Sequence, residues 1–214
     1  MRLYYFTTQQ YGLMALQNRR LKIARIKDLN DPFELLGWNL RDRETREKLK
    51  RWKSERNDEF GILCMSHKWS HPLLWGHYAE KHKGMALGFD VPESDVFLKV
   101  NYCRRRVPAP AGRKLVERDL DSLLLSKFTA WKYETEYRCF CSLNDGIRDG
   151  EHYFEPFSDT LKLKEVVVAD QATISRQGLA DALSAFGDGI AAFKARPAFG
   201  SFRVVRNRDS RLWK

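Results

Sequence analysis

The sequence predicts an α+β fold, a single domain in which short helices flank a mixed, mostly antiparallel sheet. Segments with strand character outnumber helical segments, and the helical segments are short. Strand-like segments late in the chain follow one another at hairpin-like spacing, which favours mixed or antiparallel pairing over a doubly wound sheet. No Pro-, Gly- or Ser-rich linker separates two apolar cores, so we expect one domain over residues 1–214, with a basic C-terminal segment at 194–214.

The first elements follow from local residue preferences. Residues 3–7 are mostly aromatic or β-branched and predict a strand, and a helix is expected at 8–18. Apolar residues alternate with polar or small ones over 21–26, which predicts a second strand. Asp31-Pro32 predicts a turn, because the residue before proline is driven out of the helical region.

The later elements are read in the same way. The almost entirely charged stretch 41–58 predicts an exposed helix whose thin apolar stripe contains Leu49 and Trp52. The remaining expected elements are strands at 61–66, 84–90, 96–102, 137–143, 163–168 and 202–205, helices at 73–81, 115–128 and 174–186, and a loop at 108–112.

The composition is that of an ordinary globular protein. Hydrophobic residues make up 43% and charged residues 31% of the chain, which excludes a disordered protein. No run of about 18 apolar residues occurs, so no membrane span is expected, and the N-terminus lacks the apolar region of a signal peptide. The four cysteines form no Cys-x-x-Cys pair, and we expect reduced thiols in a cytoplasmic protein.

The net charge of +10 favours an anionic partner, with nucleic acid first and nucleotide phosphate second. The alternative is a basic protein whose charge serves solubility alone. The basic residues gather at 104–106 with Arg113 and Lys114, and in the C-terminal segment 194–214, which holds seven Lys or Arg and one Asp. In this segment Arg206, Arg208 and Arg211 are candidate contacts for DNA or RNA, whereas Phe202, Val204 and Trp213 are expected in the core or in a strand.

Several common motifs are missing from the sequence. It contains no phosphate-binding P-loop, no dinucleotide-binding Gly-x-Gly-x-x-Gly and no Gly-x-Ser-x-Gly nucleophile motif. Cys64 and four nearby histidines lack the spacing of zinc ligands, so no metal site is expected. The four histidines are His67, His71, His77 and His82.

Three polar motifs are the candidates for a working site. The first is Asn30-Asp31-Pro32-Phe33-Glu34. A capped turn explains its first three residues, but it does not explain an aromatic beside an acid. We expect Asn30 and Asp31 to fix the turn and Phe33 with Glu34 to face a cleft.

The second motif is Trp75-Gly76-His77-Tyr78, which follows a strand ending in Ser66. Trp75 and Tyr78 lie three apart and share a helix face, so both could be plain core aromatics. With His77 and Ser66 close in sequence, the set suits a pocket that stacks a ring and holds a phosphate.

The third motif is Trp131 to Arg138, which leads into a strand. Glu134, Glu136 and Arg138 would lie on one face of an extended segment. Two acids and a base on a buried strand are costly unless they are paired or functional. The alternative is a salt-bridge ladder on the surface.

At these motifs the chain resembles the bacterial family called "domain of unknown function 2971". The resemblance covers about residues 3–170, and the family name states no activity. The matching segments are 3–7, 29–34, 74–79 with 83–90, 100–102, 131–138 and 164–168.

A more distant similarity is to ADP-ribosyltransferases, especially DNA-modifying toxins. Those enzymes begin with a strand that carries an aromatic and a histidine before threonine. Here Tyr5 stands where they have histidine, and Thr7 matches the threonine. Their site ends with a Glu that opens a strand, as Glu136 does here. The similarity implies an ADP-ribosyltransferase-like fold and NAD as the substrate.

This similarity leads to the functional expectation: an NAD-dependent ADP-ribosyltransferase, acting as a bacterial toxin or phage-defence effector on nucleic acid or protein. Glu136, or else Glu134, would stabilise the oxocarbenium-like state as the nicotinamide–ribose bond breaks. An antitoxin protein is a further expected partner. The residues expected to bind NAD are Tyr5, Thr7, Asn30, Asp31, Phe33, Glu34, Ser66, Trp75, His77, Tyr78, Trp131 and Arg138.

Two alternatives stay open. The chain could be a non-catalytic nucleic-acid-binding or sensor module of a defence system, with its polar motifs serving structure. It could also be a metal-dependent nuclease in which Asp31, Glu34, Glu134 and Glu136 bind Mg²⁺ if the first and third motifs meet.

Overall fold

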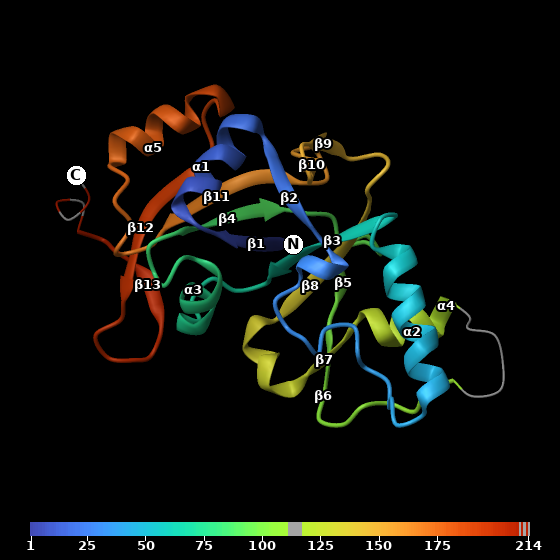
Figure 1. Ribbon diagram of the computed structural model, residues 1–214. Coiled ribbons are helices and arrows are strands. Elements are labelled where there is room, and N and C mark those ends of the chain that lie inside the picture. Colours follow the sequence, from blue (N-terminus) through green and yellow to red (C-terminus); the bar gives the residue numbers. More distant parts are fainter. Residues whose placement is uncertain (111–116, 210, 212, 214) are drawn as a thin grey trace. The chain divides into compact units, whose positions relative to one another are not determined.

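The structure, a computed structural model shown in Figure 1, describes residues 1–110, 117–209, 211 and 213. It confirms the expected α+β class, a single domain with 28% helix, 34% strand and a mixed, mostly antiparallel sheet. Within the described ranges, none of the helices has the length and apolarity to cross a membrane. Some expected features lie outside the described residues. They are the start of the helix expected at 115–128, the end of the loop expected at 108–112, Arg113 and Lys114 of the basic cluster, and Lys214 of the tail.

The contacts within the chain divide it into two compact units, each made of separate stretches. Unit 1 contains Met1–Leu21, Met65–Ser94 and Pro156–Lys214. Unit 2 contains Lys22–Cys64 and Asp95–Glu155.

Unit 1 is built on five strands in the order β13-β12-β11-β4-β1. All neighbours are antiparallel except β11 and β12, which run parallel. The strands are β1 (Arg2–Thr7), β4 (Met85–Asp90), β11 (Lys162–Val168), β12 (Ala191–Pro197) and β13 (Val204–Arg206). The helices are α1 (Gln9–Asn18), α3 (Pro72–Tyr78), α5 (Arg176–Leu183) and the 3₁₀ turn η3 (Ser184–Phe186).

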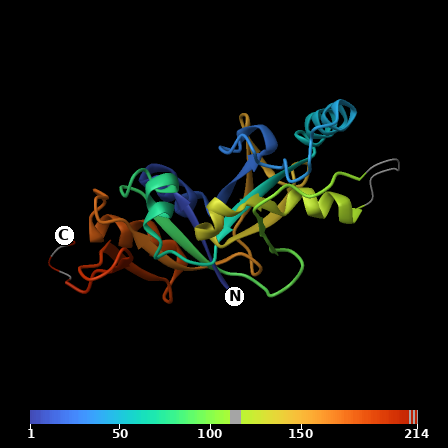
Figure 2. The ribbon, with the colours of Figure 1, turned by 90° about the horizontal axis from the view of Figure 1, so that it is seen from below.

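The central strand of unit 1 is β4, which pairs with β1 on one side and β11 on the other. Five of its residues, at 85–89, are buried, so the strand reads as a continuous apolar run rather than an alternating one. Helix α3 contacts β1, as Figure 2 shows, and α1 contacts α5. Helix α1 begins where the Thr8 hydroxyl accepts a hydrogen bond from the backbone N–H of Tyr11, and it ends at Arg19, whose φ of 49° closes the helix.

Unit 2 has strands in the order β5-β8-β3-β2-β10-β9, together with a separate parallel pair, β6 and β7. The strands are β2 (Arg20–Arg25), β3 (Phe60–Ser66), β5 (Leu98–Lys99), β6 (Asn101–Cys103), β7 (Ser126–Phe128), β8 (Glu136–Ser142), β9 (Ile147–Asp149) and β10 (His152–Pro156). The helices are η1 (Ile26–Asp28), α2 (Arg43–Arg56), α4 (Glu117–Leu124) and the 3₁₀ helix η2 (Thr129–Glu134).

Two small apolar clusters support unit 2. Ile26, Leu35 and Ile62 form one of them. In the other, Leu49 of α2 packs with Trp38 and Leu123, and Trp52 adds to its edge, so the expected apolar stripe of the charged helix is confirmed.

The structure corrects several expected elements. The strand expected at 96–102 is split, because β5 pairs with β8 whereas β6 pairs with β7. The helix expected at 115–128 ends at Leu124, and residues 126–128 instead pair with β6. Strands β9, β10 and β12 were not expected. Phe202, which was expected in the core or a strand, is 98% exposed before β13, whereas Val204 is buried as expected.

Two glycines of unit 1 provide a matched test of how closely the backbone packs beside β1 and α3. A Cβ at Gly84 would collide with the backbone carbonyl of Thr7 and the backbone of Ala79, whereas a Cβ at Gly76 on α3 meets open space. We expect Gly84→Ala to lower the free energy of unfolding by about 1–3 kcal/mol, as overpacking does. Gly76→Ala should leave stability unchanged or raise it by up to about 1 kcal/mol, because alanine favours helix. Urea denaturation of both variants tests this, and equal losses would contradict it.

Candidate functional site

The Asp31 turn directs two neighbouring side chains in opposite directions. The Asp31 carboxylate accepts a hydrogen bond from the N–H of Phe33 at 2.9 Å, and its carbonyl accepts one from the N–H of Glu34 at 2.9 Å. Phe33 therefore points outward, with 64% of its surface exposed, whereas Glu34 is buried. Asp31 fixes the turn as expected, while Asn30 is exposed.

The segment from Glu134 to Arg138 is not the single extended face that the sequence predicts. Glu134 ends the 3₁₀ helix η2, and Thr135 adopts a left-handed conformation with φ 44° before β8 begins. Only Glu136 and Arg138 share a face of the strand. Glu134 is nevertheless buried beside Glu136, because the left-handed residue turns the chain between them.

Five charged side chains of unit 2 meet in a buried ion cluster. They are the carboxylates Glu34, Glu134 and Glu136 and the cations Lys127 and Arg138, and none of these side chains is more than 7% exposed. Arg138 donates from Nη2 to Glu34 Oε1 at 2.6 Å and from Nε to Glu136 Oε1 at 2.8 Å. Lys127 Nζ donates to Glu134 Oε2 at 2.6 Å and to Glu136 Oε2 at 2.8 Å.

The backbone adds further bonds to the ion cluster. Arg138 Nη1 donates to the carbonyl of Leu124, the last residue of α4, at 2.6 Å. Lys53 of α2 donates from Nζ to the carbonyl of Glu34 at 2.7 Å. The N–H of Glu136 donates to the Tyr102 hydroxyl at 2.8 Å. The cluster therefore ties α2, α4, β6 and β8 to the Asp31 turn.

Electrostatics keeps Glu136, Lys127 and Arg138 ionised despite their burial. Burial alone would raise the pKa of the Glu136 carboxyl, but Arg138 and Lys127 outweigh burial and lower it to about 2. Burial would likewise lower the pKa of Lys127 and of Arg138, but the carboxylates raise both. Burial raises the pKa of the nearby Cys64 thiol, which stays protonated.

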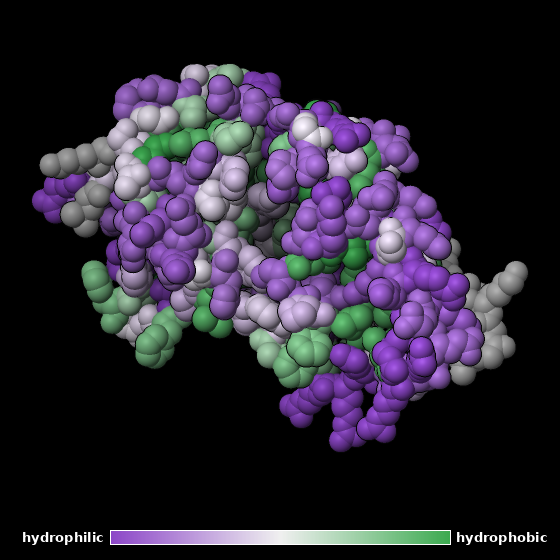
Figure 3. Space-filling model, viewed as in Figure 1, coloured by the Kyte–Doolittle hydropathy of each residue, from purple (hydrophilic) through white to green (hydrophobic). Residues whose placement is uncertain are grey.

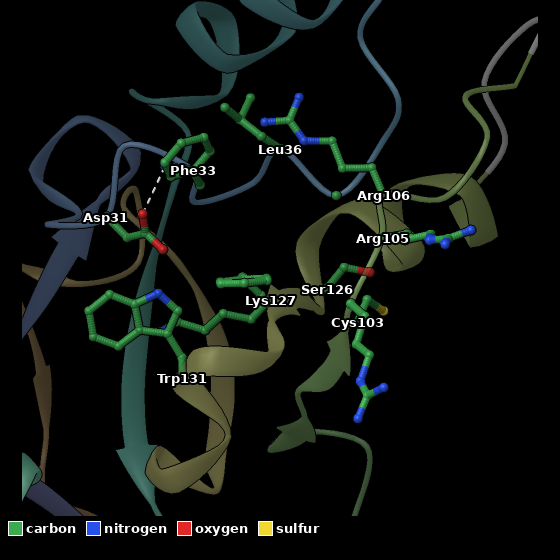
Figure 4. A pocket seen from close by; sticks show the side chains of 12 residues that line it. Asp31, Phe33, Leu36, Cys103, Arg105, Arg106, Ser126, Lys127 and Trp131 are labelled. Atoms are coloured by element: carbon green, nitrogen blue, oxygen red, sulfur yellow. Dashed lines mark hydrogen bonds between the residues drawn. The ribbon is translucent and has the colours of Figure 1, made fainter.

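A pocket of about 320 Å³ lies in the same unit (Figure 4). Figure 4 shows the Asp31 carboxylate between the rings of Phe33 and Trp131, and the Lys127 side chain running toward Trp131. The lining residues are Asp31, Phe33, Leu36, Gly37, Cys103, Arg104, Arg105, Arg106, Ser126, Lys127, Phe128 and Trp131. We call this the arginine-rimmed pocket.

Cations lie against aromatic faces around the arginine-rimmed pocket. Lys127 Nζ is 5.4 Å from the centroid of the Trp131 ring, and Arg106 Cζ is 5.8 Å from that of Phe33. Such pairs combine a surface for a planar ring with positive charge for an anion. Among the residues that line the pocket, Asp31 carries an acidic side chain.

Lys127 belongs both to the ion cluster and to the pocket wall. Carboxylates hold its ammonium group, and its side chain is one of those that line the pocket. The ion cluster thus fixes the position of one side chain of the pocket wall.

The Trp75 motif belongs to unit 1. Trp75 is buried, donates from its indole N–H to the carbonyl of Trp69 at 2.6 Å and packs edge-on against Phe6 at 5.3 Å between ring centroids. Ser66, the last residue of β3, falls in the stretch of unit 1 that begins at Met65. It is buried, and its hydroxyl donates to the carbonyl of Lys68 at 2.7 Å. These contacts give Trp75 and Ser66 structural roles in unit 1.

The other expected NAD-binding residues of unit 1 lie on β1 and α3. On β1, Thr7 is buried opposite Met85 and Tyr5 is half-buried opposite Leu87. On α3, His77 is exposed and Tyr78 is half-buried, with 6.1 Å between their ring centroids.

The first and third motifs therefore meet in unit 2, as the nuclease alternative requires. Glu34, Glu134 and Glu136, however, face Lys127 and Arg138. The Asp31 carboxylate instead accepts a hydrogen bond from the N–H of Phe33. In the part of the chain that the structure describes, no group of three or more His, Cys, Asp or Glu side chains is placed to hold a metal ion.

Sequence reasoning missed Lys127 and did not assign Arg104, Arg105 and Arg106 to a site. The three arginines were noticed only as a basic cluster. Lys127 fell inside an expected helix, where one lysine among leucines carries no signal. Recognising the short strand 126–128 would have been needed to place it.

Comparison of the chain with protein-family models, curated proteins and solved structures found no match. The resemblances to the two families therefore stay expectations that depend on the motifs alone.

From the ion cluster we predict that replacing Arg138 strongly lowers the free energy of unfolding. Arg138→Met leaves three buried carboxylates with one ammonium group, and breaking such a buried pair costs about 3–5 kcal/mol of unfolding free energy. Arg138→Lys keeps the charge but loses the forked geometry, so its loss should be smaller. Arg51→Met, on the exposed face of α2, is the matched control and should change stability by less than about 0.5 kcal/mol. Equal losses for Arg138→Met and Arg51→Met in denaturant titrations would show that the cluster does not hold the unit together.

Proposed function

We propose that unit 2 binds a nucleotide in the arginine-rimmed pocket, with the base against Phe33 and Trp131 and the phosphates on Arg104 to Arg106. The observation that carries this proposal is the alternation of cations and aromatic faces around one hollow. Aromatic faces stack on bases, and arginine binds phosphate through paired hydrogen bonds.

The size of the pocket supports a mononucleotide or one half of a dinucleotide. Its volume, about 320 Å³, is at the lower end of the range typical of ligand pockets, which begins at about 300 Å³. NAD, the substrate implied by the similarity to ADP-ribosyltransferases, would place one nucleotide inside and the other along the rim.

A second proposal is catalysis: transfer of ADP-ribose from NAD to an acceptor, with release of nicotinamide. The observation that favours it is the Asp31 carboxylate between two aromatic rings (Figure 4). A carboxylate there would stabilise positive charge on the ribose as the bond to nicotinamide breaks. Both oxygens of Glu136 are engaged by Arg138 and Lys127, so we assign Glu136 to positioning Lys127 rather than to contact with the ribose.

The acceptor in this proposal is a nucleic acid or a protein, as for a toxin or phage-defence effector, and an antitoxin remains a proposed partner. The basic segment 194–214 is the proposed contact for DNA or RNA. Arg206, Arg208 and Arg211 are all exposed, although Arg211 pairs with Asp209 at 2.9 Å.

Nucleotide binding is tested by calorimetric titration with NAD, AMP and ribose 5-phosphate. We expect NAD and AMP to bind and ribose 5-phosphate, which has no base, to bind at least about tenfold more weakly. Phe33→Ala and Arg106→Ala should each weaken AMP binding by about tenfold, through lost stacking and a lost charged hydrogen bond.

The matched controls for these two variants are the exposed residues Ile147 and Arg51, which do not line the pocket. Ile147→Ala and Arg51→Ala should bind AMP like the parent. Failure of AMP and NAD to bind at millimolar concentration, or equal affinity in Phe33→Ala and the parent, would reject the nucleotide pocket.

Catalysis is tested separately, by release of nicotinamide from NAD with and without nucleic acid. Asp31→Asn removes the charge but keeps a side chain that supports the same turn. We expect it to reduce turnover by about a hundredfold or more while AMP binding is retained. Glu136→Gln should reduce turnover less than Asp31→Asn. If Glu136→Gln abolishes turnover in a protein of parental stability and Asp31→Asn does not, Glu136 is the catalytic acid. Absence of turnover by the parent would leave unit 2 as a binding module.

A further inference from the structure

The hairpin between β12 and β13 exposes two phenylalanines in unit 1. The strands pair antiparallel from Ala195 opposite Arg206 to Pro197 opposite Val204, and the N–H of Ala198 donates to the carbonyl of Arg203 at 2.8 Å. Phe199 and Phe202 lie in the loop that joins them and are 93% and 98% exposed. Figure 3 shows hydrophobic side chains standing out from the surface where Figure 1 places this hairpin.

The stability of unit 1 does not explain why phenylalanine occupies these two positions. Phenylalanine stabilises a fold when its ring leaves water, and here both rings remain in water. A protruding pair of aromatics is instead typical of a surface that contacts a partner. The charges and rings around the hairpin indicate which chemistry such a partner would need.

Cations flank the aromatic rings of the hairpin. Arg196 Cζ lies 4.1 Å from the centroid of the Phe199 ring and covers one of its faces. Arg206 Cζ lies 4.8 Å from the centroid of Phe193, a ring on β12. Arg203, within the loop, is exposed.

A basic pocket of about 380 Å³ adjoins the base of the hairpin, since both include β12 and Arg206. Four of its lining residues are cations: Arg176, Lys194, Arg206 and Arg208. The acid in the pocket, Asp209, is engaged by Arg211, whose Nε and Nη2 both lie 2.9 Å from its carboxylate oxygens. The pocket therefore has the charge for a phosphate group.

We infer that this face of unit 1 binds single-stranded nucleic acid, with unpaired bases stacked on Phe199 and Phe202 and backbone phosphates in the basic pocket. A duplex keeps its base faces covered, so the exposed rings favour a single strand. The inference rests on the proposed contact between segment 194–214 and nucleic acid and specifies which form of nucleic acid binds there. It is independent of the nucleotide pocket proposed for unit 2.

The test is fluorescence anisotropy of the full chain with labelled single strands of DNA and of RNA of about 20 nucleotides, and with the matching duplex. We expect the single strands to bind at least about tenfold more tightly than the duplex. Phe199→Ala combined with Phe202→Ala should weaken single-strand binding by about tenfold or more, because each base loses its stacking surface. The control Tyr11→Ala removes another exposed aromatic of unit 1, on α1, and should bind like the parent.

The salt dependence of the oligonucleotide affinity distinguishes the contribution of base stacking from that of phosphate contacts. The phenylalanine double variant should keep the parental slope of log affinity against log salt, because stacking releases no counterions. Arg206→Ala combined with Arg208→Ala should reduce the slope by about 1.4, because each arginine that neutralises a phosphate of a single strand adds about 0.7 to it. Lys83→Ala combined with Lys162→Ala, two exposed lysines of unit 1, is the control and should keep the slope.

Three outcomes would overturn the inference in distinguishable ways. Equal affinity for duplex and single strand, or unchanged binding by the phenylalanine double variant, rejects single-strand stacking but keeps the contact of the basic segment with nucleic acid. Absence of oligonucleotide binding by the parent at about 50 mM salt rejects both. Binding to phosphatidylserine vesicles that requires Phe199 and Phe202, without oligonucleotide binding, reassigns the hairpin to a membrane surface. None of these results affects the titrations with NAD and AMP.

Discussion

The guanidinium group of Arg138 is the constraint on which the rest of unit 2 depends. It bonds to three parts of the chain: Glu34 in the Asp31 turn, which is 104 residues away in sequence, the carbonyl of Leu124 at the end of α4, and Glu136 on its own strand β8. A planar group whose donors point in fixed, separate directions satisfies these three acceptors at once, whereas a lysine carries its three donors on a single nitrogen. Without it, buried carboxylates would remain that Lys127 alone cannot neutralise.

Burial of so many charges is a poor way to gain stability. Removing ions from water carries a large penalty, and apolar side chains of similar size often stabilise a core equally well. What the ion cluster does provide is fixed geometry, because each hydrogen bond fixes a direction as well as a distance. Its carboxylates hold the ammonium group of Lys127 at the wall of the pocket and beside Trp131. We therefore interpret the cluster as a support that fixes the position of Lys127 in the pocket wall.

The sequence predicts the parts of this arrangement that depend on local residue preference. Strands β1, β4 and β11 and the Asp31 turn appear where aromatic, β-branched and Asp-Pro patterns place them. Strand β7 was missed because it exists only through its pairing with β6, and Lys127 was therefore not assigned to the site. Strand β12 was missed because its alanines have low strand propensity, and its parallel pairing with β11 is a long-range contact. The exposure of Phe202 was mispredicted because residue type does not reveal that a residue lies at a hairpin tip.

The distribution of the positive charge supports the proposal of nucleotide ligands rather than a role in solubility alone. Positive charge promotes solubility wherever it contacts water. A basic surface that serves solubility alone therefore does not require aromatic rings beside its cations. Here cations lie over aromatic rings in both units: Lys127 and Arg106 over Trp131 and Phe33 in unit 2, and Arg196 and Arg206 over Phe199 and Phe193 in unit 1. A base and a phosphate are joined in every nucleotide, so a ring face next to a cation matches both parts of one ligand. The half-open pocket in unit 2 has the size proposed for a single nucleotide, whereas the protruding hairpin in unit 1 fits the proposal of a polymer whose successive bases can each reach a ring.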